Sequence, residues 1–436
     1  MPIGRAAAAV LAVVACLVAG CSDDPASPEA DPSLVRVPQD ADSIQDAVDR
    51  VAAGGLVLVD EGVYRESVVV STADVTLRGV DRGGTVVDGE GERPYGVVGI
   101  ADGLRVQNLT VRDHTFYGVL VTGVHDGDVP SANNGDDYAE FDPDRFPPVQ
   151  RFAIDHVTAH NNGLYGIYAF DAQHGVIADS YASGSADSGI YVGQCHACDI
   201  LVTGSVAERN AVGFENANAS GPLVVTGNRF TGNRVAMTLL SNYQEAFRPQ
   251  RGNQIVGNVI GASGAGDSPA QADGGFGTGL GIAGGVGNEI ARNRIVGNPR
   301  AGVLLTNTED LPASGNTFTG NVFAGNATDI ANISAVRAPA TANCVTGRVT
   351  TVPAALAPAL GCGTATSQPA AAPAVIARRA RAPRGMSFLD VTHPGEQPGL
   401  SSVTGGLERL PDRVVMPDTA RIGVPPASLL SGRGGS

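Results

Sequence analysis

The chain of 436 residues contains no lysine, so all 29 of its basic side chains are arginines, against 44 Asp and Glu residues. The formal net charge is −15 at pH 7. A nucleic-acid-binding protein needs a basic surface, so this balance argues against nucleic acid as a partner. It also argues against anionic lipid headgroups, and it permits a cation-dependent site or a neutral or basic ligand. Acidity that serves only solubility explains the charge equally well.

Long apolar runs are also absent, apart from one stretch at residues 6–18. This run is short for a membrane-spanning helix, and it leads through small residues to Cys21. The segment resembles a bacterial lipoprotein signal, which implies cleavage before Cys21 and a lipid on its thiol. We expect a signal peptide at 1–20, a flexible tether at 21–33 and an exported protein anchored on the outer face of the cytoplasmic membrane. An ordinary signal peptide and a membrane anchor are the alternatives.

One pattern recurs about every 21 to 24 residues through the middle of the chain, and such a period is typical of solenoids. Short β-branched runs alternate with corners rich in Asn, Gly, Asp and Ser, which tolerate left-handed backbone. Gly166, Gly189 and Gly213 mark one corner, 23 and then 24 residues apart. No single coil can bury its apolar face alone, so stacked coils share a continuous core. The pattern predicts an all-β fold, a single-stranded parallel β-helix.

Asparagines five residues apart recur in the later repeats. They occur at Asn228/Asn233, Asn253/Asn258, Asn288/Asn293/Asn298 and Asn316/Asn321/Asn326. Equivalent corners lie above one another in a solenoid, so these amides can form ladders along the stack. We interpret them as structural residues because their spacing follows the corners.

With these repeats the chain resembles the right-handed parallel β-helix proteins of the pectate-lyase-like superfold, and in particular the bacterial group that includes the NosD-like accessory proteins. Residues 37–70 also match the N-terminal entry of that group. Here Ser43 is a candidate helix N-cap, and Ile44, Ala47, Val48 and Val51 form an apolar stripe on a short helix that plugs the open end of the core. The resemblance implies a fold and leaves the function open, because this fold supports many activities.

These features predict a right-handed β-helix at 34–343 with an N-terminal capping helix, a C-terminal cap at 344–363 and an extended Pro/Ala/Gly-rich tail at 364–436. Two apolar pieces of the tail, at 386–391 and 421–430, can dock on the solenoid or on a partner.

Four cysteines remain after Cys16 leaves with the signal and Cys21 is lipidated. They are Cys195, Cys198, Cys344 and Cys362. An even number in an exported chain favours two disulfides. A Cys344–Cys362 bridge would close the last part of the solenoid. The Cys195-His196-Ala197-Cys198 segment can form a tight disulfide, a redox pair or part of a metal site.

Several interruptions of the repeats fall beside the same strand, so they are expected to gather on one face. The segments 124–150, 243–251 and 308–314 follow this strand, and 262–276 precedes it. Loops on a rigid scaffold are where binding and catalytic sites concentrate. The first loop is the most acidic, and a solvated loop is the simpler interpretation. Its candidate Ca²⁺ ligands are Asp126, Asp128, Asp136 and Asp137.

Two polar columns are expected on this loop-bearing face. If Ile167, Ile190 and Phe214 point inward, then Tyr168, Tyr191 and Glu215 point outward on three neighbouring coils and suit a sugar chain. At the strand ends, Asp171, Gln194 and Asn218 form a second column. Solvated side chains without a function are an equally good interpretation.

A uronic-acid polymer bound here would need its carboxylate neutralised and a base at the α carbon. Asp171 and Glu215 can hold Ca²⁺ against that carboxylate, and Arg248, His174 or a tyrosine can take the proton. However, the Asp-Pro-His-Glu pattern of alginate epimerases is absent, as are the pectate-lyase and galacturonase signatures.

Three hypotheses follow for an exported protein that we expect to be monomeric. The first is binding or modification of envelope polysaccharide on the loop-bearing face. The second is a non-catalytic scaffold that docks other envelope proteins. The third is a NosD-like accessory factor with metal at Cys195, His196 and Cys198, although the four methionines do not cluster as a copper site would favour.

Overall fold

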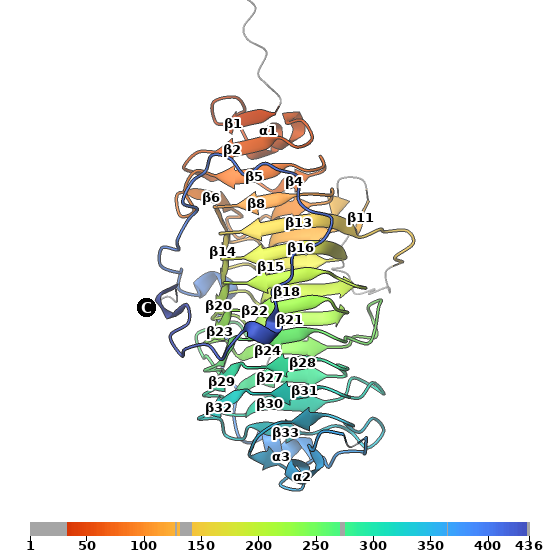
Figure 1. The fold of residues 1–436 in the computed structure, drawn as a ribbon. Coiled ribbons are helices and arrows are strands. Elements are labelled where there is room, and N and C mark those ends of the chain that lie inside the picture. The colour runs from red at the N-terminus through yellow and green to blue at the C-terminus, as the bar shows by residue number, and fades with distance from the viewer. Residues whose placement is uncertain (1–32, 127–128, 131–141, 271–274, 364, 434–436) are drawn as a thin grey trace, which may run out of the picture.

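The computed structural model describes residues 33–126, 129–130, 142–270, 275–363 and 365–433. Three parallel sheets run along a single elongated solenoid (Figure 1). Each complete coil contributes one strand to each sheet, and the partial coils at the two ends contribute fewer, so the order within a sheet follows the order of the coils. The predicted right-handed parallel β-helix is confirmed.

Sheet A has twelve strands. They are β1 (Leu34–Val37), β2 (Leu56–Val59), β5 (Thr76–Gly79), β8 (Arg105–Gln107), β13 (Val149–Asp155), β16 (Ala172–Ala178), β19 (Ile200–Thr203), β22 (Leu223–Thr226), β25 (Gln254–Val256), β28 (Glu289–Ala291), β31 (Thr317–Thr319) and β34 (Cys344–Val345).

Sheet B has ten strands. They are β3 (Gly62–Tyr64), β6 (Thr85–Asp88), β9 (Thr110–Arg112), β14 (Thr158–His160), β17 (Tyr181–Ser183), β20 (Val206–Glu208), β23 (Arg229–Thr231), β26 (Val259–Gly261), β29 (Arg294–Val296) and β32 (Val322–Ala324).

Sheet C has eleven strands and bears the loops. They are β4 (Val68–Val70), β7 (Tyr95–Gly99), β10 (Tyr117–Thr122), β15 (Ile167–Phe170), β18 (Ser188–Cys195), β21 (Val212–Ala219), β24 (Val235–Leu240), β27 (Thr278–Ala283), β30 (Ala301–Thr306), β33 (Ile330–Asn332) and β35 (Thr351–Val352). A separate antiparallel pair, β11 (His125–Asp126) and β12 (Val129–Pro130), starts the first loop.

The predicted capping helix is α1 (Ile44–Arg50). Ser43 caps it, because its Oγ accepts a hydrogen bond of 3.0 Å from the Asp46 amide. Ile44, Ala47 and Val48 are buried against the first coils. The helix therefore covers the open N-terminal end of the core, as the apolar stripe indicates.

The predicted asparagine ladders are confirmed. In one ladder, the amide oxygen of each asparagine accepts hydrogen bonds from the main chain and the side chain of the asparagine before it, from Asn228 to Asn258, Asn258 to Asn293 and Asn293 to Asn321. A second runs through Asn288, Asn316 and Asn343. These ladders satisfy buried amide groups that would otherwise destabilise the corners.

The C-terminal region is docked on the solenoid along its length. The short helices α2 (Leu356–Ala359) and α3 (Pro373–Ala377) lie at the C-terminal end of the stack. Residues 386–433 then run back toward the first coils and return, as the blue trace in Figure 1 shows. The sequence left open whether this segment docks on the solenoid or on a partner. In the structure it docks on the solenoid of the same chain.

Arginine side chains of the solenoid hold this segment by its main-chain carbonyl groups. Arg82 donates to Pro398, Arg78 to Val403 and Gly405, Arg292 to Thr419 and Ile422, and Arg294 to Pro425. A guanidinium offers five donors in a planar fork, so one side chain can hold two carbonyl oxygens of an extended segment.

Candidate functional site

The outer face of sheet C is built from stacked rows of side chains whose register is fixed by parallel pairing. As predicted, Ile167, Ile190 and Phe214 point into the main core. The residues that alternate with such inward-pointing side chains form one outward-facing row along the molecule. This row consists of Leu120, Tyr168, Tyr191, Glu215, Thr238, Gly281 and Leu304. The two ends of this row differ in chemistry.

The N-terminal part of the row is covered by an aromatic cluster, which we define as Tyr117, Tyr165, Tyr168, Phe170 and Tyr191. The rings of Tyr165 and Tyr168 lie 4.3 Å apart, and those of Tyr168 and Tyr191 lie 4.8 Å apart. Tyr168 and Tyr191 are only 6% and 1% exposed. They point outward as predicted, but the structure does not present them as an open platform for a sugar.

The tyrosines are not exposed as predicted, because the neighbouring loops fold back over the outer face of sheet C. Phe146 from the first loop packs against the cluster, and so do Ala246 and Phe247 from the second. Apolar side chains on these loops gain stability by excluding water from the outward tyrosines. Repeat periodicity alone carries no signal for where loops fold back.

Glu215 is half-buried next to Tyr191 in the outward row and forms a pair with Asp187. It accepts a hydrogen bond from the Ser188 hydroxyl and shares another with Asp187. Burial and then the charge of Asp187 raise the pKa of Glu215 well above its usual range. A half-buried carboxyl whose pKa is raised and which is already paired with Asp187 is poorly suited to hold Ca²⁺ against a substrate.

Asp171, Gln194 and Asn218 do form the predicted column, with left-handed backbone at φ of 55°, 54° and 43°. All three are fully buried. Asn218 holds the second loop, since its side chain bonds to the main chain of Asn242 and Glu245. Burial raises the pKa of Asp171 to about 8.

The remaining predicted catalytic residues lie elsewhere. His174 lies in β16 of sheet A, where its Nδ1 is 2.8 Å from Oδ2 of Asp199. Arg248 is exposed on the second loop and stacks over Tyr243 at 4.9 Å. The four predicted catalytic side chains therefore share no open surface. Among the predicted Ca²⁺ ligands, Asp126 is exposed in β11, whereas Asp128, Asp136 and Asp137 lie outside the described residues.

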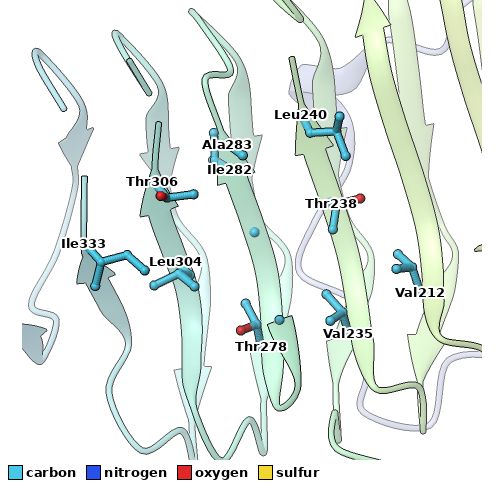
Figure 2. A pocket seen from close by; sticks show the side chains of 12 residues that line it. Val212, Val235, Thr238, Leu240, Thr278, Ile282, Ala283, Leu304, Thr306 and Ile333 are labelled. Atoms are coloured by element: carbon cyan, nitrogen blue, oxygen red, sulfur yellow. The ribbon is translucent and has the colours of Figure 1, made fainter. Parts of the chain in front are cut away.

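The C-terminal part of the row opens into a groove that sequence reasoning missed. It has a volume of about 450 Å³ and crosses strands β21, β24, β27 and β30 to Ile333 (Figure 2). Its walls are Val212, Val235, Leu240, Leu304 and Ile333, and its hydroxyl groups come from Thr238, Thr278 and Thr306. Among the described residues, none that lines this groove is charged.

Gly281 forms the floor of the groove because it stands in the outward row without a side chain. A methyl group there would meet only ordinary contacts, with Thr238 Cγ2 at 3.8 Å and the Met237 carbonyl oxygen at 3.9 Å. One end of the groove meets α3, whose Ile376 packs with Leu304. The other end meets the aromatic cluster through Leu240. The sequence feature that could have indicated the groove is the alternation of apolar residues around Gly281 in 278–283.

The structure contains both disulfides that the sequence predicts. The Cα atoms of Cys195 and Cys198 are 5.0 Å apart, and those of Cys344 and Cys362 are 4.8 Å apart. Oxidised cysteines offer no thiolate to a metal. A separate group of Asp155, His156 and Asp179 has ligand atoms within 4.8 Å of one another, but Arg433 contacts the Asp179 carboxylate at 3.3 Å.

A family model described as NosD, a periplasmic copper-binding protein, matches residues 147–337. The chain carries a NosD-like parallel β-helix. The matched segment starts just before β13 and includes all strands that form the groove. No curated protein sequence matches the chain significantly.

Several solved structures are similar at low sequence identity. The A-module of mannuronan C-5 epimerase AlgE6 from Azotobacter vinelandii is 15% identical over 67% of this chain and 94% of that chain, with a TM-score of 0.42. An alginate lyase from Paenibacillus is 15% identical over 65% and 93%, with a TM-score of 0.36. Pectate lyase Pel9A is 14% identical over 57% of this chain and 64% of that chain, with a TM-score of 0.38.

Among the described residues, no helix has the length and apolar character needed to cross a bilayer.

Proposed function

We propose that this protein is an exported, non-catalytic β-helix protein that binds an aliphatic chain in the groove of sheet C. The uncharged, aliphatic lining of that groove carries the proposal. The match to a periplasmic family supports export. A lipid on Cys21, as the N-terminal sequence predicts, would keep the groove near the membrane, which is a source of acyl chains.

The shape of the groove suits an elongated ligand. Five stacked coils span about 19 Å at the usual spacing between strands, and the volume of about 450 Å³ lies in the range of ligand sites. Each methylene buried here contributes about 0.8 kcal/mol. The threonine hydroxyls can orient a polar end group without supplying a charge.

The groove is a poor match for a uronic-acid polymer. Such a ligand carries one carboxylate per sugar, and burying an unpaired charge is costly. Asp171 and Glu215 are not among the lining residues, and neither is the exposed Arg248. The proposal differs from all three hypotheses from the sequence and shares only the absence of catalysis with the second, in which the protein docks other envelope proteins.

The proposal is tested by titrating the purified protein with a fluorescent fatty acid and displacing it with unlabelled palmitate. We compare the wild type with Gly281→Leu, which fills the floor, and with Gly281→Ala as the matched control. We expect saturable binding that Gly281→Leu weakens at least 10-fold and Gly281→Ala weakens little.

A panel of uronate polymers, with and without Ca²⁺, runs in parallel with ultraviolet detection of unsaturated products. Product formation would replace the proposal with a lyase. Equal fatty-acid binding by the wild type and a folded Gly281→Leu variant would place the ligand outside the groove.

A further inference from the structure

The first long loop is fastened to the solenoid at one residue. The Asp171 carbonyl oxygen accepts hydrogen bonds from the amides of Gly123 and Val149, each 3.1 Å long. These two residues are the last before the loop and the first after it, because β10 ends at Thr122 and β13 begins at Val149. The side chain of Asp171 therefore lies where both ends of the loop meet.

The Asp171 carboxylate is enclosed without a hydrogen-bond partner. The residue is 0% exposed, and within the described part of the chain neither of its two oxygens has a hydrogen-bond partner. None of the ion pairs found among the described residues includes it. Buried polar groups are nearly always satisfied, so such a group calls for an explanation.

A second oxygen lies close to Gly123 together with the Asp171 carboxylate. A methyl group on Gly123 would lie 2.6 Å from Oδ2 of Asp171 and 2.1 Å from the carbonyl oxygen of Pro147. These distances leave no room for a side chain, so both oxygens approach the backbone this closely only because residue 123 is glycine. Pro147 itself is exposed.

The next coil supplies another unsatisfied oxygen. Gln194 follows Gly193, which pairs with Phe170, so Gln194 and Asp171 are neighbours in the stack. Both share a left-handed backbone. Gln194 is 0% exposed, and both its Oε1 and Nε2 lack a hydrogen-bond partner among the described residues.

We propose that the Asp171 carboxylate, the Gln194 side-chain oxygen and the Pro147 carbonyl oxygen form a Ca²⁺ site at the base of the first loop. Carboxylate, amide and carbonyl oxygens are the ligands this hard cation prefers, and water molecules complete its coordination. The bound ion neutralises a buried charge and ties the end of the loop to the coil. This site is independent of the groove and of the ligand proposed for it.

The test is the melting temperature of the metal-stripped protein with and without millimolar Ca²⁺, with NaCl at equal ionic strength as reference. We compare the wild type, Asp171→Asn and, as a matched control, Asp49→Asn, which removes an exposed carboxylate on α1. Ca²⁺ should raise the melting temperature of the wild type and of Asp49→Asn by about 3 °C or more. The folded Asp171→Asn variant should show no such shift, and calorimetry should give one ion per wild-type chain.

Three results overturn the proposal. One is the same shift in Asp171→Asn, which would place the ion elsewhere. Another is an equal response to NaCl. The third is no response to Ca²⁺ together with a more stable Asp171→Asn, which would show that the carboxyl is held neutral without an ion.

Discussion

Glu215 is a half-buried carboxyl on the outer face of sheet C. Its pKa in the folded protein is raised by burial and by the neighbouring Asp187. In the unfolded chain it titrates near pH 4.3. The folded state therefore binds the extra proton above that pH, and stability falls as pH rises from the unfolded pKa through the folded one.

Replacing Glu215 with Gln keeps the shape of the side chain and removes its titration. We expect the melting temperature of Glu215→Gln, relative to wild type, to increase between pH 5 and pH 9. Thermal melts across this range measure the difference. Glu289→Gln, which removes a carboxylate elsewhere on the solenoid, serves as the control. A difference that is independent of pH would show that Glu215 is already ionised in the folded protein.

The sequence correctly predicted that Tyr168 and Tyr191 point outward from sheet C. It also predicted that they are exposed, and in the structure they are buried. The alternation of Ile167 with Tyr168 and of Ile190 with Tyr191 shows which side of a strand faces the core. Whether the side chains on the other side of the strand are exposed to solvent depends on loops that pack over them, here through Phe146 and Phe247. Such contacts join residues distant in sequence and leave no periodic signal.

At the scale of elements, the corners between strands depend on the asparagine ladders. Asn258 accepts hydrogen bonds from the main chain and side chain of Asn228 and donates to Val225, Val256 and Asn293. Because the residue is fully buried, water cannot replace these partners. The recurrence of these asparagines at the corners of successive repeats predicted this arrangement, because equivalent corners lie above one another.

Asn258→Ala should lower the free energy of unfolding by about 3 kcal/mol or more, because several buried partners lose their hydrogen bonds at once. Denaturant unfolding followed by circular dichroism provides the measurement. Asn326→Ala is the matched control at a half-exposed ladder end and should cost less. If both variants lost equal stability, the ladder interior would have no special role.

At the scale of the whole molecule, the C-terminal segment fastens coils that are far apart. Arg82 is 1% exposed and donates to Pro398, while Arg292 holds Thr419 and Ile422 much further along the stack. Burial is the main cause that lowers the pKa of Arg82 to about 9. The composition of the segment predicted an extended chain but did not show its path, because arginine-to-carbonyl contacts have no sequence pattern.

Removing residues 386–436 should therefore lower the melting temperature by several degrees while the β-sheet signal in circular dichroism remains. The deletion exposes Arg82 and Arg78 to water and frees each coil from its distant neighbours. Limited proteolysis should also become faster within the solenoid. An unchanged melting temperature would mean that the segment adds nothing to the stability of the stack.

Calorimetric titration with palmitate shows whether the groove on sheet C binds an aliphatic chain. Measured at two temperatures, wild type should bind one molecule with a negative heat-capacity change, the mark of apolar burial. Gly281→Leu should show little or no binding heat, and Gly281→Ala should resemble wild type. No binding by the wild type, or equal binding by a folded Gly281→Leu variant, would contradict the claim.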